Sequence, residues 1–343
     1  MRSKIFIIPL AFLFAAFSHA SRSTTVTTPD ASQKAAVYQR IGLTDIKIVY
    51  HSPAVKKREI WGKLVPFGKV WRAGANENTV IQFSTDVMVE GKLLKKGKYG
   101  LHTIPGENEW TIIFSTNETS WGSYFYDEKE DSIRVEVKPT ESDFNEWLTY
   151  EFSERDNDSA MISLKWEKIA VPIRVNVNTR EIVLDNFRKE LRSLPYWYWE
   201  GTYDAAKYCL ENDINLEDAL KWIGQSISVQ ENFLNLMLKA EILKKLGKTA
   251  EASFIEKYAN KIALDREITQ YAYSFWYTDR AKTLKILKEN NRKFNNWFTH
   301  RALGRYYSYI QDKVNAVKYL NIALKKAPQH QKEGISKSIR SLN

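Results

Sequence analysis

The last quarter of the chain carries small and apolar residues at the fixed offsets of a helical hairpin. Within residues 300–328, the small side chains of Gly304, Ala316 and Ala323 permit two antiparallel helices to approach each other closely. Pro328 follows where a new helix begins, a position at which the missing N–H costs little. One such hairpin has too little core to fold alone and depends on stacking against its neighbours. This feature therefore predicts an array of paired helices in the C-terminal half.

The spacing resembles that of the tetratricopeptide repeat, and weaker copies precede it. Alanines recur at Ala219, Ala252, Ala281 and Ala316, at intervals of 33, 29 and 35 residues. We predict three or four helical hairpins over residues 178–343 that form one solenoid. An irregular helical bundle with chance spacing is the alternative. Stacked hairpins of this kind form a groove that binds other chains.

Before residue 178 the helical period gives way to alternation. Short segments rich in β-branched and aromatic residues are bounded by clusters of turn-forming residues, which is the pattern of half-buried strands. The clearest segments are 79–83, 110–114, 133–137, 148–152 and 162–166. The predicted fold is a multidomain chain, with an antiparallel β-sandwich or flattened barrel over residues 44–177 followed by the α-helical solenoid.

The N-terminal residues have the organisation of a secretory signal peptide. Arg2 and Lys4 precede an apolar run over residues 5–17, and small residues at Ser18 and Ala20 suit a signal peptidase. We therefore predict a signal peptide over residues 1–20 and export of the mature protein. The Ser- and Thr-rich residues 21–43 predict a flexible leader.

Cysteine usage indicates the compartment. Cys209 is the only cysteine, so the chain forms no intrachain disulfide. An exported protein of this size without disulfides favours the periplasm or outer surface of a bacterial cell. No stretch of the mature chain has the length and apolar character of a transmembrane segment.

The net charge of +10 is concentrated at the C-terminus. Residues 21–180 hold 22 basic and 22 acidic residues, residues 181–264 hold 11 and 13, and residues 265–343 hold 16 and 6. A solvated lysine-rich face explains this excess. The alternative is an electrostatic footprint for an acidic protein, an acidic polymer or glycan, or lipid head groups. The export signal argues against nucleic acid.

The β-rich half carries several short motifs between Ser52 and Tyr124. They include Ser52-Pro53, Ile60-Trp61-Gly62, Trp71-Arg72, Gly74-Ala75-Asn76-Glu77, Gly97-Lys98-Tyr99, Ile104-Pro105 and Trp121-Gly122. In these motifs, residues 44–175 resemble the bacterial family known as domain of unknown function 2911. The resemblance implies the fold and an exported protein, and it implies no activity.

The loop around Arg72 is the main candidate for a ligand site. The Arg72 guanidinium suits a carboxylate or phosphate, Asn76 and Glu77 complete a polar pocket, and Trp71 is expected to form a stacking wall. In the purely structural alternative, Arg72 pairs with Glu77 and holds the loop. An enzyme site formed by these polar residues with His102 is a second hypothesis.

A third hypothesis concerns the aromatic residues of another loop. Trp121 and Tyr124 lie in a glycine-containing loop and suit a carbohydrate-binding module, because their faces match the apolar faces of sugar rings. The histidines lack metal-ligand spacing, so we predict no metal and no cofactor. No nucleophile motif is present, and the acidic run 127–131 is interpreted as a solvated turn.

The leading functional prediction is a non-enzymatic envelope scaffold that binds a ligand through its β domain and a protein partner through its helices. The sequence leaves open whether the β domain is catalytic, and the lack of a recognisable catalytic motif favours a non-enzymatic protein. The predicted partner groove lies on the first helix of each hairpin. Its candidate residues are Asn235, Lys239, Trp297, Arg301 and Arg305.

Overall fold

A computed structural model describes residues 28–342 of the chain. The chain divides into two compact units at Ile182/Val183, which we call the β unit and the helical unit. The predicted signal peptide at residues 1–20 lies outside the described residues. None of the helices within residues 28–342 has the length and apolar character needed to span a membrane.

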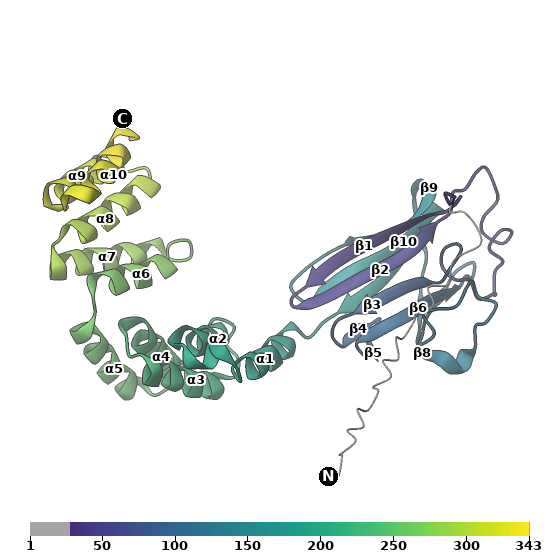
Figure 1. Cartoon of the computed structure of the whole chain (residues 1–343), viewed down its shortest axis with the longest axis horizontal. Helices are drawn as coiled ribbons and strands as arrows, with labels where there is room; N and C mark the ends of the chain where they lie inside the picture. The colour runs from purple at the N-terminus through teal and green to yellow at the C-terminus, as the bar shows by residue number, and fades with distance from the viewer. Residues whose placement is uncertain (1–27, 343) are drawn as a thin grey trace, which may run out of the picture. The chain divides into compact units, whose positions relative to one another are not determined.

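The β unit is built from two antiparallel sheets (Figure 1). The larger sheet has the strand order β1-β2-β3-β6-β7-β8, and the smaller has the order β5-β4-β10-β9. The strands of the described chain are β1 (Gln33–Ile41), β2 (Thr44–Ser52), β3 (Thr79–Phe83), β4 (Val87–Val89), β5 (Lys92–Leu94), β6 (Gly97–Ile104), β7 (Trp110–Ser115), β8 (Asp131–Val137), β9 (Thr140–Ser153) and β10 (Ser159–Asn176).

Alternating side chains of the two sheets form one hydrophobic core. Ile48, Leu101 and Ile112 point inward from the larger sheet, and Leu164 and Ile173 point inward from the smaller one. Each of these side chains is buried, because successive residues of a strand face opposite sides of its sheet. The predicted antiparallel β fold over this part of the chain is confirmed.

The prediction of a flexible leader over residues 21–43 is wrong from Gln33 onward. Strand β1 pairs with β2 along its whole length, from Gln33 opposite Ser52 to Ile41 opposite Thr44. The polar composition of this segment obscures its alternation, because only every second side chain packs toward the core. Ala35 is one of these inward side chains.

Ten α-helices follow β10 in the described chain, with a short 3-10 helix (Leu194–Trp197) between the first two. They are α1 (Thr179–Glu190), α2 (Trp199–Glu211), α3 (Leu216–Val229), α4 (Phe233–Lys245), α5 (Thr249–Ile262), α6 (Asp265–Ser274), α7 (Arg280–Phe294), α8 (Trp297–Tyr309), α9 (Lys313–Lys326) and α10 (Gln329–Arg340). Short polar side chains begin several of them: Asp279, Asn296 and Asp312 each accept a hydrogen bond from a backbone N–H of the first turn.

The helices pack in sequential pairs, α2 with α3, α4 with α5, α6 with α7 and α8 with α9. Close approach of the last pair depends on Gly304, since a Cβ there would lie 2.7 Å from Leu320 Cγ. Ala219 and Ala316 are fully buried on the second helices of their pairs. Ala281 is exposed, and Thr283 is buried in its place, so the predicted alanine spacing is wrong at this one repeat.

Candidate functional site

The candidate site lies on the outer face of the larger sheet. His102 pairs with Ile113, and Ile113 pairs with Arg134, so these three residues form one row across β6, β7 and β8. Directly paired residues of antiparallel strands share a face. Because Leu101 and Ile112 point into the core, the row containing His102 points to the opposite side of the sheet.

The connection between β7 and β8 covers this outer face. Its path depends on Gly100 of β6, because a Cβ there would lie 2.4 Å from the carbonyl oxygen of Asn117. The backbone N–H of Asn78 donates to the carbonyl of Ser120 over 3.1 Å, and Glu77 forms a β-bridge with Trp121. These contacts bring the predicted loop around Arg72 and the predicted aromatic loop together.

The side chains of Trp71 and Arg72 lie on opposite sides of the sheet. The backbone of Trp71 exchanges two hydrogen bonds with Thr103, at 2.7 and 2.8 Å, which extends the sheet beside β6. The Trp71 ring turns inward and stacks on Trp166, with ring centroids 5.9 Å apart. Arg72 lies beside Trp121, with its Cζ 6.0 Å from the ring centroid. The predicted stacking wall is therefore mainly a core residue.

Arg72 is a half-buried cation that makes no ion pair within the described chain. Its Nε is buried and has no hydrogen-bond partner among residues 28–342. Burial lowers the pKa of its guanidinium, and the tyrosine hydroxyl of Tyr124 opposes that effect. The predicted structural pair with Glu77 does not form, because the Glu77 carboxylate lies 3.3 Å from Nδ1 of His51. An arginine stays charged in such a setting and offers its donors to an acceptor from solution.

A pocket of about 270 Å³ opens beside Arg72. It is lined by Val70, Trp71, Arg72, Ser123 and Tyr124. The rings of Trp121 and Tyr124 stack in parallel, with centroids 5.8 Å apart. Both rings remain more than half exposed, at 54% and 77%. The pocket therefore combines a cation that lacks an acceptor with exposed aromatic surface.

His102 lies beneath this loop and contacts it through Ser123. The His102 Nδ1 is 3.2 Å from the Ser123 hydroxyl, and the ring packs 5.3 Å from that of Tyr126. Burial lowers the pKa of His102 to about 4, although the charge of Asp131 opposes the shift. The imidazole is therefore neutral at pH 7. Sequence reasoning missed Ser123, because only the fold brings it to His102.

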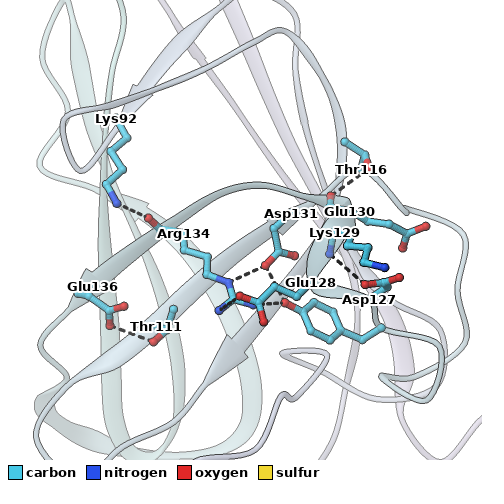
Figure 2. Close-up of polar contacts among 11 residues, drawn as sticks. Lys92, Thr111, Thr116, Asp127, Glu128, Lys129, Glu130, Asp131, Arg134 and Glu136 are labelled. Atoms are coloured by element: carbon cyan, nitrogen blue, oxygen red, sulfur yellow. Dashed lines mark hydrogen bonds and ion pairs between the residues drawn. The ribbon is translucent and has the colours of Figure 1, made fainter.

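A charged network closes one end of the covered face (Figure 2). The Asp131 Oδ2 accepts hydrogen bonds from Arg134 Nε over 2.6 Å and from the Tyr126 hydroxyl over 2.7 Å. The Arg134 Nη1 also lies 3.2 Å from Glu128. Asp131 Oδ1 is buried and has no hydrogen-bond partner in the part of the chain that the structure describes. The interpretation of residues 127–131 as a solvated turn is therefore wrong for Asp131, whose side chain is only 8% exposed.

Asn76 has a conformational role in the same loop. Its φ of +55° is left-handed, a region that asparagine tolerates better than most residues. Its side-chain amide donates to the carbonyl of Ser32 over 3.4 Å. Asn76 is not among the residues that line the pocket of Arg72.

Metal-ligating side chains do not gather in threes anywhere within residues 28–342. His51 and His102 occur on the same sheet, but the residues that they contact are different, Glu77 and Ser123 respectively. Cys209 is buried in the helical unit, and burial raises the pKa of its thiol to about 11. The thiol is therefore protonated at neutral pH and has little nucleophilic character.

The predicted partner groove divides into buried and accessible residues. Asn235 is fully buried, and its side-chain amide accepts from the backbone N–H of Asn232 and donates to the carbonyl of Gln230, so it offers no surface to a partner. Trp297 packs against a core cluster of the last helices. Arg301 and Arg305 line a small pocket with aromatic side chains.

One family model matches part of the β unit. Residues 32–175 match the model of the DUF2911 family, described as a protein of unknown function. The DUF2911 region begins at the first strand and ends within the last, so it contains Arg72, its pocket and the network of Asp131. No curated protein matches the chain.

Proposed function

We propose that the β unit binds a small acidic ligand in the pocket of Arg72, and that an acidic sugar is the best chemical fit. The carrying observation is that the Arg72 side chain lines the pocket and that its guanidinium makes no ion pair with residues 28–342. Guanidinium groups bind carboxylates through paired, charge-assisted hydrogen bonds. A carboxylate of the ligand supplies the acceptor that the described chain does not.

The aromatic surface supports a sugar ring as the remainder of that ligand. The C–H face of a pyranose is apolar and packs against aromatic rings. Trp121 and Tyr124 present such rings beside Arg72, and the pocket of about 270 Å³ suits a single small molecule. The arginine hypothesis and the carbohydrate hypothesis thus converge on one site.

Thermal-shift and fluorescence titrations of the full chain test this proposal with glucuronate, glucose and acetate. We expect glucuronate to bind best, because it alone offers both the carboxylate and the ring. Arg72→Gln is expected to abolish the preference for glucuronate over glucose, and Trp121→Ala to weaken both sugars. Arg155→Gln, at an exposed arginine of the same unit, is the matched control. Equal binding of glucuronate and glucose by the wild-type chain refutes the proposal.

A second candidate function is ester hydrolysis at the same pocket. Its support is the distance of 3.2 Å between the Ser123 hydroxyl and His102 Nδ1. In that reaction the Ser123 oxygen attacks the ester carbon, its proton passes to the neutral imidazole of His102, and the alcohol departs with that proton, which leaves the acyl group on Ser123. Water then attacks the acyl carbon and gives a proton through His102 to the Ser123 oxygen, so that the carboxylic acid is released and the serine is restored. Turnover of nitrophenyl esters that is lost in Ser123→Ala, with ligand affinity retained, would establish it. Turnover unchanged by that substitution excludes it.

We further propose that the protein is exported to a bacterial envelope and that its helical unit holds a protein partner. The support is the charged start, apolar run and small residues of positions 1–20, together with the helical pairs. Cell fractionation of the full chain and of a chain lacking residues 2–20 tests export. Retention of both forms in the cytoplasm refutes it.

A further inference from the structure

The helical unit carries a surface of arginine and aromatic side chains on α6, the turn that follows it, the start of α7, and α8. We call it the arginine–aromatic surface and define it by Arg280, Arg301, Arg305, Tyr273, Trp276 and Tyr309. Two pockets open on it, of about 300 Å³ and about 40 Å³. Tyr273 and Arg305 line both pockets, so the two pockets adjoin each other on this surface.

Aromatic rings hold two of these arginines in place. The Arg305 Cζ lies 5.8 Å from the ring centroid of Tyr273, and the Arg280 Cζ lies 5.5 Å from that of Tyr309. Guanidinium planes that lie against rings are oriented and partly desolvated, so they lose less freedom when they bind an anion.

The rings are themselves fixed by their neighbours. Trp276 packs against Tyr309 at 5.0 Å and against Tyr306 at 5.6 Å. The Tyr306 hydroxyl donates to the carbonyl of Arg280 over 2.9 Å, which ties the start of α7 to α8. The surface is therefore assembled before any partner binds, which reduces the entropic cost of binding.

The surface has positive charge without a neutralising carboxylate. The ion pairs of the described helical unit involve lysines and Arg188, and none involves the three arginines of this surface. Arg301 instead reaches the side-chain oxygen of Gln331 over 3.5 Å. The surface also lies in the segment 265–343, which holds 16 basic and 6 acidic residues. Complementarity therefore requires an acidic partner.

We propose that the arginine–aromatic surface binds an acidic polypeptide segment in which an aromatic or aliphatic side chain stands beside the carboxylates. The larger pocket has mostly aromatic walls and a size suited to one side chain, with Arg305 in its lining and Arg280 beside Tyr309. Such a site selects an aromatic or aliphatic residue whose neighbours in the peptide are acidic. A uniform polyanion gains little from aromatic pockets of this size. The inference rests on the proposed partner-binding role of the helical unit and is independent of the pocket of Arg72.

Fluorescence polarisation with the full chain tests the inference. The probe is a labelled ten-residue peptide with a central tryptophan flanked by glutamates, and its comparison peptide has glutamines in their place. We expect the glutamate peptide to bind at least about tenfold more tightly. The double variant Arg280→Ser/Arg305→Ser is expected to lose that difference. Lys313→Ser/Lys325→Ser removes the same charge from exposed sites of α9 and is expected to change the affinity by less than about twofold.

Several outcomes overturn the inference. Equal losses in the arginine and lysine variants would show that net charge alone attracts the peptide. Tighter binding of an oligonucleotide, of heparin or of vesicles rich in phosphatidylglycerol would assign the surface to another class of partner. If the arginine variant still captures from envelope extract the same protein as the wild-type chain, this surface is wrong and the partner-binding role stands. If the wild-type chain captures no protein, the partner-binding role fails as well.

Discussion

The β unit and the helical unit bury their hydrophobic residues in different ways. The β unit has one continuous core drawn from both sheets, whereas the helical unit divides its buried residues among several small clusters along the chain. A change in the β core should therefore affect the whole unit, while a change in a helical cluster should act on its neighbours. The same contrast applies to function. The pocket of Arg72 needs segments distant in sequence, and the arginine–aromatic surface needs only successive helices.

The largest effect is expected from Trp166→Ala in the β core. Trp166 is 1% exposed and stacks on Trp71. We expect a loss of about 3–5 kcal/mol in the free energy of unfolding, because the substitution removes a large buried ring and leaves a cavity. Hydrogen exchange in urea should show reduced protection throughout strands β1 to β10 and unchanged protection in α4 to α9. An equal loss of hydrogen-exchange protection in both units would contradict the different core organisation of the two units.

Acidification is expected to weaken the β unit through His102. Its pKa is about 4 in the folded chain and near 6.5 when exposed, so between these values only the unfolded chain takes up the proton. The free energy of unfolding is therefore unaffected by His102 well above pH 6.5, and it falls by up to about 3 kcal/mol as the pH is lowered toward 4. Urea midpoints between pH 7 and pH 4 measure it. The variant His102→Phe should show a smaller fall, and an identical fall would contradict this assignment.

A single methyl group at Gly100 is expected to cost about 2 kcal/mol, because it would meet the backbone oxygen of Asn117 at 2.4 Å. The covering loop must then move, so affinity for the acidic ligand should fall in parallel. Gly97→Ala in the same strand is the control, since its Cβ meets only ordinary contacts beginning at 3.4 Å. Calorimetric unfolding and ligand titration of both variants decide the matter. A stable Gly100→Ala chain with intact binding would show that the loop does not depend on this glycine.

The smallest effect is expected at Gly304, where alanine would meet Leu320 Cγ at 2.7 Å. Leucine can shift and alanine favours helix, so we expect a net loss of about 1 kcal/mol confined to α8 and α9. Gly224→Ala is the opposite case, because no atom lies within 4 Å of its added Cβ, and it should stabilise α3. Local hydrogen exchange distinguishes the two. A loss of hydrogen-exchange protection that extends to α2 would argue against a helical unit in which each pair is stabilised only by its neighbours.

Local patterns predicted most of the fold because each unit has a strong period. The helical pairs follow from the spacing of Ala219, Ala252 and Ala316, whose burial the structure shows. Strand β1 was missed, because its alternation is diluted by polar side chains and its stability comes from pairing with β2. Thr283 was missed in its repeat, since a buried threonine in a helix has no signature in the sequence.

The candidate site was predictable in its residue types and not in its connections. Arg72, Trp121 and Tyr124 stood out as polar and aromatic residues in loops, and the fold brings them together. The sequence could not indicate that Glu77 pairs with His51, or that Arg72 Nε lacks an acceptor among the described residues. It also could not distinguish Asp131 from its acidic neighbours, because only the three-dimensional path buries one of them.

The central claim is that Arg72 is held without an acceptor so that a ligand carboxylate can occupy its guanidinium. Isothermal titration of the full chain with glucuronate and with its uncharged amide tests it most directly, since the two ligands share the ring. The account predicts that the acid binds at least about tenfold more tightly than the amide. It also predicts that Arg72→Gln removes this difference while Arg155→Gln preserves it. Equal affinities in the wild-type chain, or a preference that survives Arg72→Gln, would contradict the claim.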